Sequence, residues 1–143
     1  MNWYLTVVKD NYFNFKGRAR RKEYWMFVLI NIIITSILMF LDNLLGLNIV
    51  SERETFMGKI EVEQPYGYLY SIYGLLVLIP GIAVSFRRLH DIGRSGWYFL
   101  WLFLPLIGFI LVTIAMCRDS QPEENQFGIS PKYGDEDFEE EVE

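Results

Sequence analysis

Apolar and polar positions are sharply segregated along this chain. Three stretches contain no charged residue and no histidine, and these are 24–41, 66–86 and 95–117. A helix that crosses a hydrocarbon core of about 30 Å needs roughly 20 apolar residues, because each residue advances the helix by 1.5 Å. The pattern therefore predicts an all-α integral membrane protein with three transmembrane helices, over about 24–45, 66–87 and 95–117.

The first apolar stretch also has the basic flank of a secretory signal peptide. However, its 18 or more apolar residues exceed the usual hydrophobic region of such a peptide, and 42–45 offers no small-residue cleavage site. An uncleaved anchor is favoured. Extending this span to Leu45 places Asp42 near one membrane interface, where its carboxylate is buried or reaches toward water.

Composition changes this picture only in detail. The chain has 143 residues, is 52% hydrophobic and carries a net charge of −5, with a mean hydropathy of +0.18. Residues 1–117 hold eleven basic and eight acidic residues, whereas 118–143 hold two basic and ten acidic ones. These values argue against a wholly disordered chain, a disulfide scaffold and a nucleic-acid-binding domain. They indicate a mildly basic membrane domain, 1–133, followed by an acidic, disordered tail, 134–143.

Lysine and arginine positions predict the orientation, because cytoplasmic loops carry an excess of both. With three spans and a cytoplasmic N-terminus, nine of these residues lie inside and four outside; the opposite orientation reverses the counts. The prediction is a multi-pass protein with a cytoplasmic N-terminus and an extracytoplasmic C-terminus.

The segment before the first span has two parts. Residues 2–14 place Trp3 and Val7 on one helical row, which predicts a short amphipathic helix on the inner membrane surface. A basic run follows and is expected to contact anionic lipid headgroups through Lys16, Arg18, Arg20, Arg21 and Lys22. Anchoring of the topology explains this run, and a specific lipid or partner site is the alternative.

The loop over 42–65 contains an alternating stretch at 59–63, after a less regular one at 48–56. A turn at Met57-Gly58 would give a small hairpin. An isolated hairpin is marginal in water, so a loose loop or a helical extension remains an equal alternative.

The richest polar string lies between the second and third apolar stretches, at 85–97. It contains a cluster of candidate functional or structural residues: Arg87, Arg88, His90, Asp91, Arg94, Ser95 and Trp97.

One interpretation of this string is a tight corner between two helices. Arg87 or Arg88 would pair with Asp91 along one helix face, Gly93 would end that helix, and Ser95 would cap the next one. The other interpretation is a pocket for a phosphate or carboxylate, in which His90 senses pH or relays a proton.

The same residues limit the chemistry. A single histidine excludes a His-pair metal site, and no carboxylates flank it at ligand spacing. Cys117 is expected on the opposite membrane face from His90, so no Cys–His arrangement is predicted, and no phosphate-binding glycine loop occurs. We therefore expect no catalytic residues, no metal and no cofactor.

Three motifs occur together in order: Phe15–Trp25, Arg88–Trp97 and Glu124–Pro131. In this combination the chain resembles the bacterial membrane family catalogued as domain of unknown function 805 (DUF805), the YhaH-like proteins. The resemblance covers roughly residues 2–133 and implies a bacterial inner (plasma) membrane location. It implies no activity, ligand or catalytic residue. The acidic end and the longer loop 42–65 depart from shorter members.

Three functions remain open. The favoured one is a non-enzymatic scaffold, assembly or envelope-stress factor that acts through a membrane-protein partner. The second is a homo-oligomeric channel, transporter subunit or lipid-binding protein that uses the arginine cluster for anions. The third is a membrane enzyme acting on a phosphorylated lipid with His90 as general base. The lipid bilayer is the expected partner in every case, and nucleic acid in none.

Overall fold

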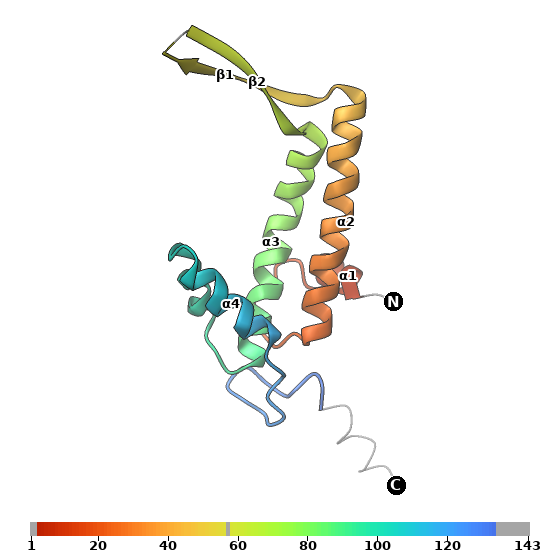
Figure 1. The fold of residues 1–143 in the computed structure, drawn as a ribbon. Coiled ribbons are helices and arrows are strands. Elements are labelled where there is room, and N and C mark those ends of the chain that lie inside the picture. Colours follow the sequence, from red (N-terminus) through yellow and green to blue (C-terminus); the bar gives the residue numbers. More distant parts are fainter. Residues whose placement is uncertain (1–2, 57, 134–143) are drawn as a thin grey trace. The chain divides into compact units, whose positions relative to one another are not determined.

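The computed structural model describes residues 3–56 and 58–133, so the predicted acidic tail, 134–143, lies outside the described residues. The helices and strands follow one another as α1 (Trp3–Leu5), the π-helix η1 (Thr6–Asp10), α2 (Arg21–Leu45), β1 (Asn48–Thr55), β2 (Gly58–Gly67), α3 (Tyr68–Asp91), the 3-10 helix η2 (Gly96–Phe103) and α4 (Ile107–Cys117) (Figure 1). The chain divides into two units, Leu29–Leu78 and the pair of segments Met1–Val28 and Ile79–Glu143.

Within residues 3–56 and 58–133, two helices are long and apolar enough to cross a membrane. They are α2, with 25 residues, and α3, with 24. Many of their large apolar side chains are exposed, including Ile32, Phe40 and Leu75. Lipid is a suitable surrounding for such a surface, and their positions agree with the first two predicted spans. α3 continues to Asp91, beyond the predicted end of its span.

In the unit Leu29–Leu78, the carboxylate of Asp42 is fully buried and caps the start of α3. Its Oδ1 accepts a hydrogen bond from the backbone N–H of Leu69 at 3.0 Å, and its Oδ2 accepts from those of Gly67 at 3.2 Å and Tyr70 at 2.9 Å. These are donors that a helix N-terminus leaves without intrahelical partners. A side chain on Gly67 would collide with this cap, since a Cβ there would lie 2.6 Å from Asp42 Cγ.

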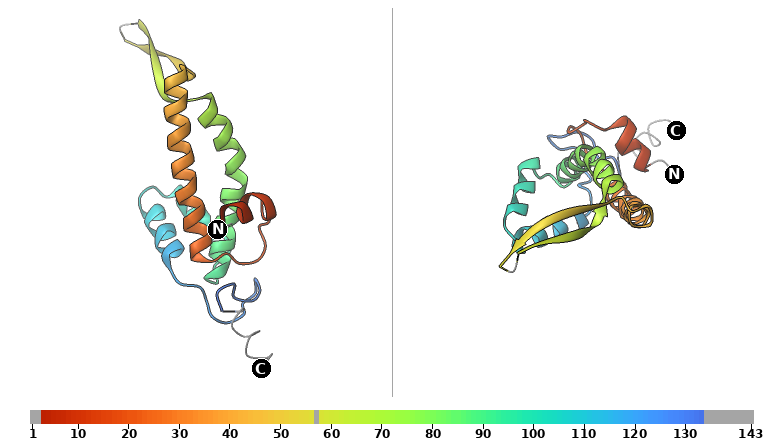
Figure 2. Two further views of the ribbon diagram at one scale, coloured as in Figure 1. Left: turned by 90° about the vertical axis from the view of Figure 1, so that its right-hand side faces the viewer. Right: turned by 90° about the horizontal axis from the view of Figure 1, so that it is seen from above.

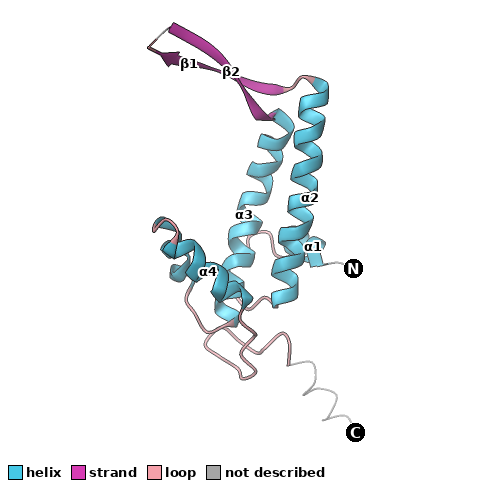
Figure 3. Ribbon diagram, in the orientation of Figure 1, coloured by secondary structure: helices cyan, strands magenta, loops and turns pink. Residues whose placement is uncertain are grey.

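The two strands form an antiparallel hairpin (Figure 3). Ser51 pairs with Val62 and Thr55 with Gly58, which has a φ of +121°. The hairpin interpretation of 42–65 is thus confirmed, and the all-α fold class is wrong to this extent. Cross-strand hydrogen bonds satisfy the backbone here, whereas a loose loop would depend on water for them.

In the other unit, α1 and η1 pack against apolar side chains of the same unit. Val7, Ala19, Phe27 and Val84 form one buried cluster, and the Tyr4 ring stacks on Phe27 with centroids 5.7 Å apart. The predicted N-terminal helix is therefore present as α1 and η1, drawn in red in Figure 2. Its apolar side is used for packing against protein as well as for any contact with lipid.

The prediction of one continuous helix over 95–117 is wrong. The segment forms η2 and α4, with a break at 104–106 where Leu106 has a φ of +65°. Pro105 lacks an N–H donor and Gly108 allows a close approach: a Cβ at Gly108 would lie 1.6 Å from the carbonyl oxygen of Trp101. α4 has 11 residues, about 16 Å at 1.5 Å per residue, which is too short for a hydrocarbon core.

Both ends of this broken segment return to the end of α3. Before η2, the Arg94 N–H donates to the carbonyl of Leu89 at 2.9 Å; after α4, the Gln121 N–H donates to the carbonyl of Asp91 at 3.1 Å. Gly93 ends α3 with a φ of +71°, as predicted. Ser95 caps the next helix, as predicted, with its Oγ accepting from the Trp97 N–H at 3.5 Å, although that helix is of the 3-10 type.

Candidate functional site

A buried polar network surrounds the side chain of Asp91, at the last residue of α3. The carboxylate is fully buried. Its Oδ1 accepts from Arg18 Nε at 3.0 Å, and its Oδ2 accepts from an Arg88 guanidinium nitrogen and from Ser120 Oγ. Arg18 comes from the N-terminal segment and Ser120 from the segment after α4, so one carboxylate joins three parts of the chain. We call Arg18, Arg88, Asp91 and Ser120 the Asp91 network.

Arg18 uses its other nitrogens on backbone carbonyls. Nη1 donates to Glu123 at 2.9 Å and to Gly128 at 3.1 Å, while Nη2 donates to Asp91 at 3.1 Å and to Gln121. The side chain is only 1% exposed. The sequence predicts that Arg18 contacts lipid headgroups. Its guanidinium instead lies inside the protein, where it binds backbone carbonyls of the loop that follows α4.

Arg88 also caps the end of α4. Its Nε donates to the carbonyl of Met116 at 3.2 Å and its Nη2 donates to that of Arg118. Arg21 donates to the intervening carbonyl of Cys117 at 3.3 Å. Guanidinium groups at this position suit the negative end of a helix and satisfy carbonyls that have no intrahelical partner.

Arg87 pairs with a different carboxylate. Its Nη2 lies 2.9 Å from Glu23 Oε1, and both side chains are less than a tenth exposed. Of the two predicted arginine pairs with Asp91, the structure forms the one with Arg88. Arg87 instead ties the start of α2 to the end of α3.

His90 is held by packing and by one hydrogen bond. Its ring stacks on Phe127 with centroids 3.8 Å apart and planes 5° apart. Nδ1 lies 3.2 Å from the carbonyl oxygen of Gly17, and the His90 carbonyl accepts from Asn125 Nδ2 at 3.0 Å. The imidazole thus connects the N-terminal segment with the loop after α4.

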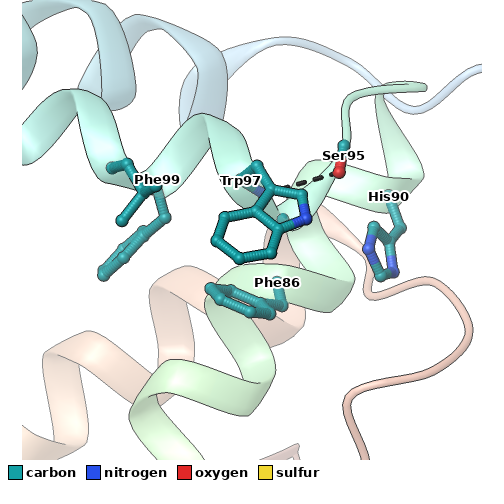
Figure 4. A pocket seen from close by; sticks show the side chains of 7 residues that line it. Phe86, His90, Ser95, Trp97 and Phe99 are labelled. Carbon is teal, nitrogen blue, oxygen red and sulfur yellow. Dashed lines mark hydrogen bonds between the residues drawn. The ribbon is translucent and has the colours of Figure 1, made fainter.

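The remaining members of the predicted cluster lie outside the Asp91 network. Ser95 and Trp97 line a largely apolar cavity of about 330 Å³ with Phe86, His90 and Phe99 (Figure 4). Trp97 is 77% exposed. The guanidinium of Arg94 lies 5.3 Å from the centroid of the Tyr98 ring.

Most of the basic run remains accessible. Lys16, Arg21 and Lys22 are exposed and Arg20 is partly exposed, unlike Arg18. Lys22 lies 6.0 Å from the centre of the Trp3 ring.

The part that the segment after α4 takes in the Asp91 network has no signal in the sequence pattern. Ser120 and Gln121 both contact Asp91. Neither is three or four residues from it along one helix, so no local sequence pattern predicts these contacts. In the part of the chain that the structure describes, no group of three or more His, Cys, Asp or Glu side chains could hold a metal ion.

Two long apolar helices and many exposed apolar side chains indicate a small, mostly helical membrane protein. Comparison with known proteins specifies it further. The family model "Protein of unknown function (DUF805)" matches residues 12–129. The chain belongs to this family.

Two similar relatives come from Escherichia coli (strain K12). "Inner membrane protein YhaH" is 47% identical over 132 residues, which cover 92% of this chain and 98% of the relative. "Inner membrane protein YhaI" is 41% identical over 134 residues, covering 94% and 98%. No solved structure matches the chain. Membership in a family of inner-membrane proteins agrees with the apolar helices.

Proposed function

We propose that this chain is a non-catalytic inner-membrane protein that acts by binding, as a scaffold or assembly factor for a membrane-protein partner. The observation that carries the proposal is the Asp91 network. Three charged residues at the end of α3 and in the N-terminal segment, Arg18, Arg88 and Asp91, are buried and bonded to one another and to backbone carbonyls. Their role in this arrangement is to hold three chain segments together, which leaves function to the exposed surface.

The proposal includes a revised topology. Both ends of the segment 95–117 contact the end of α3, so we propose that this segment is re-entrant: it enters the membrane and returns to the same side. The segment after α4 then shares the cytoplasmic side with the N-terminus, instead of the extracytoplasmic side that three spans require. Eleven of the thirteen Lys and Arg residues would be cytoplasmic, and two would lie in the hairpin outside. This agrees better with the positive-inside rule than nine against four does.

Single-cysteine labelling in intact cells tests this topology. Cys117 is the only cysteine of the chain, so a Cys117→Ser background is cysteine-free. Lys16→Cys, Phe56→Cys and Glu124→Cys each add one thiol at an exposed position. A membrane-impermeant maleimide should label only the Phe56→Cys variant before lysis, and all three variants after lysis. Labelling of Glu124→Cys before lysis would show that the segment 95–117 crosses the membrane completely.

Crosslinking in native membranes tests the binding role. After solubilisation in mild detergent, the tagged chain should be recovered in a defined complex with another membrane protein. Recovery of this chain by itself, with or without crosslinker, would contradict the proposal.

A histidine variant tests the enzymatic alternative. In His90→Asn, the side-chain amide can donate to Gly17 as Nδ1 does, but it cannot accept a proton as a general base. The complex and the cellular amount of protein should both remain unchanged. Hydrolysis of a phosphorylated lipid by purified wild type, lost in His90→Asn while the melting temperature is kept, would establish the enzyme instead.

A further inference from the structure

We propose that Arg94 and Arg118 form a binding site for the phosphate group of an anionic phospholipid. Both side chains line one cavity of about 120 Å³, together with Tyr98 and the apolar residues Leu111 and Ile114. The site is separate from the Asp91 network, whose arginines are buried and already bonded. It goes beyond the proposed binding role, which does not depend on it.

The charges of these two arginines are not neutralised internally. Neither guanidinium forms an ion pair with a carboxylate of residues 3–56 or 58–133, and both side chains are exposed. The carboxylate next in sequence, Asp119, binds Lys132 at 2.7 Å. Two like charges that share a small cavity repel each other, and an anion between them removes that repulsion.

Capping of α4 does not account for Arg118. The carbonyls of Met116 and Cys117 accept from the side chains of Arg88 and Arg21, and the carbonyl of Arg118 itself accepts from Arg88. The guanidinium of Arg118 is therefore not needed at the helix end. Arg94 is also partly preorganised, because its guanidinium lies 5.3 Å from the centre of the Tyr98 ring.

The composition of the cavity points to a lipid as the source of the phosphate. Leu111 and Ile114 belong to the apolar α4, which ends at Cys117, and Arg118 follows directly. An apolar helix surface that changes to arginine over one residue matches the change from acyl chains to phosphate in a lipid leaflet. Guanidinium groups bind phosphate oxygens through two parallel hydrogen bonds, which gives them an advantage over lysine.

Native mass spectrometry from nanodiscs tests the site. The discs contain phosphatidylcholine with a minor share of phosphatidylglycerol, and the readout is the dissociation constant for retained phosphatidylglycerol. Wild type should retain it in preference to phosphatidylcholine. An Arg94→Ala/Arg118→Ala variant should bind it at least about tenfold more weakly, because each guanidinium loses charge-assisted hydrogen bonds to the phosphate, which diffuse attraction at the surface does not supply. Loss of less than about threefold would overturn the proposal.

Two variants separate a built site from general attraction by positive charge. Lys9→Ala/Lys16→Ala removes the same charge from two exposed lysines of the N-terminal segment, and it should change binding by less than about threefold. Arg94→Lys/Arg118→Lys keeps the charge but loses the paired hydrogen bonds, and it should weaken binding by about fivefold. Equal losses in the two alanine variants would show diffuse attraction and overturn the proposal. Unchanged melting temperatures confirm that every variant is folded.

A soluble anion is distinguished from a lipid by a second arm. Inorganic phosphate is added to wild type in nanodiscs of phosphatidylcholine alone. The lipid proposal expects no binding of millimolar phosphate that depends on Arg94 and Arg118. Binding of inorganic phosphate that is lost in Arg94→Ala/Arg118→Ala would assign the site to a free anion instead.

Discussion

In the described part of the chain, the side chains of two aspartates are fully buried, and they are compensated in opposite ways. Asp42 accepts three backbone N–H groups at the start of α3. Asp91 lies at the other end of α3 and accepts from two arginines and a serine. The positive end of a helix suits a carboxylate, whereas the negative end does not. Asp42, a residue of α2, is therefore stabilised largely by backbone N–H groups at the start of α3, whereas Asp91 requires side chains brought from distant segments.

Asp42 therefore caps one helix end, whereas Asp91 joins three segments of the chain. Removing Asp42 affects the start of one helix. Removing the Asp91 side chain leaves two buried guanidinium groups without their carboxylate, and it removes side-chain bonds that join the N-terminal segment and Ser120 to the end of α3. Replacing Asp91 should therefore lower the stability more, and affect more of the chain, than replacing Asp42.

The largest effect is expected for Asp91→Ala. Breaking a buried ion pair by removing one partner costs about 3–5 kcal/mol, because an uncompensated charge stays buried. We expect the free energy of unfolding, measured by denaturant titration in detergent micelles, to fall by about this amount. Limited proteolysis should also show earlier cleavage within 118–133. Glu124→Ala removes an exposed carboxylate and serves as the control. If the two variants were equally stable, the Asp91 network would contribute nothing.

A smaller effect is expected for Asp42→Ala. The substitution leaves three backbone donors without their side-chain acceptor, and a buried donor without its partner costs about 1–3 kcal/mol. Asp42→Asn keeps one acceptor oxygen but replaces the other by an NH2 donor that would face a backbone N–H, so it should restore only part of the stability. Cleavage within 118–133 should stay at the wild-type rate in both variants. Its acceleration in Asp42→Ala would remove the distinction between a local and a long-range role.

The smallest effect is expected for Asp119→Asn, at an exposed ion pair close to the Asp91 network. The hydrogen bond from Lys132 lowers the pKa of the Asp119 carboxyl. A depressed folded-state pKa stabilises the protein above the unfolded value, and this contribution is lost as the pH falls through the folded one. Wild type should melt slightly above Asp119→Asn at neutral pH, and the difference should vanish in acid. A difference that grew in acid would contradict this assignment.

Several elements could be predicted because their determinants are local. The apolar length of 66–86 requires a membrane-spanning helix or a buried one, and the alternation at 59–63 favours a strand. Gly93 ends α3 and Ser95 caps η2 for reasons that lie within a few residues of each. The pairing of Arg88 with Asp91 follows from helical spacing in the same way.

The candidate site was predictable only in part. Arg18 belongs to a basic run that suggests headgroup contact, yet its partner lies 73 positions away in sequence. Ser120 and Arg118 carry no local signature that distinguishes them from surface residues. These contacts depend on which segments meet in the folded chain. Hydropathy, periodicity and charge along the sequence do not specify which segments those are.

The sequence by itself indicated a membrane protein, and it located the two apolar segments that form α2 and α3 and an alternating stretch that allowed a hairpin, because length, hydropathy and alternation act over neighbouring residues. The tertiary structure decided the course of the third apolar segment. Its 23 residues are enough for a span, but the break at 104–106 and the contacts of Asp91 with Arg18 and Ser120 return it to the end of α3. The break near Pro105 and the ion pair between Arg18 and Asp91, 73 positions apart, depend on packing, which hydropathy does not measure.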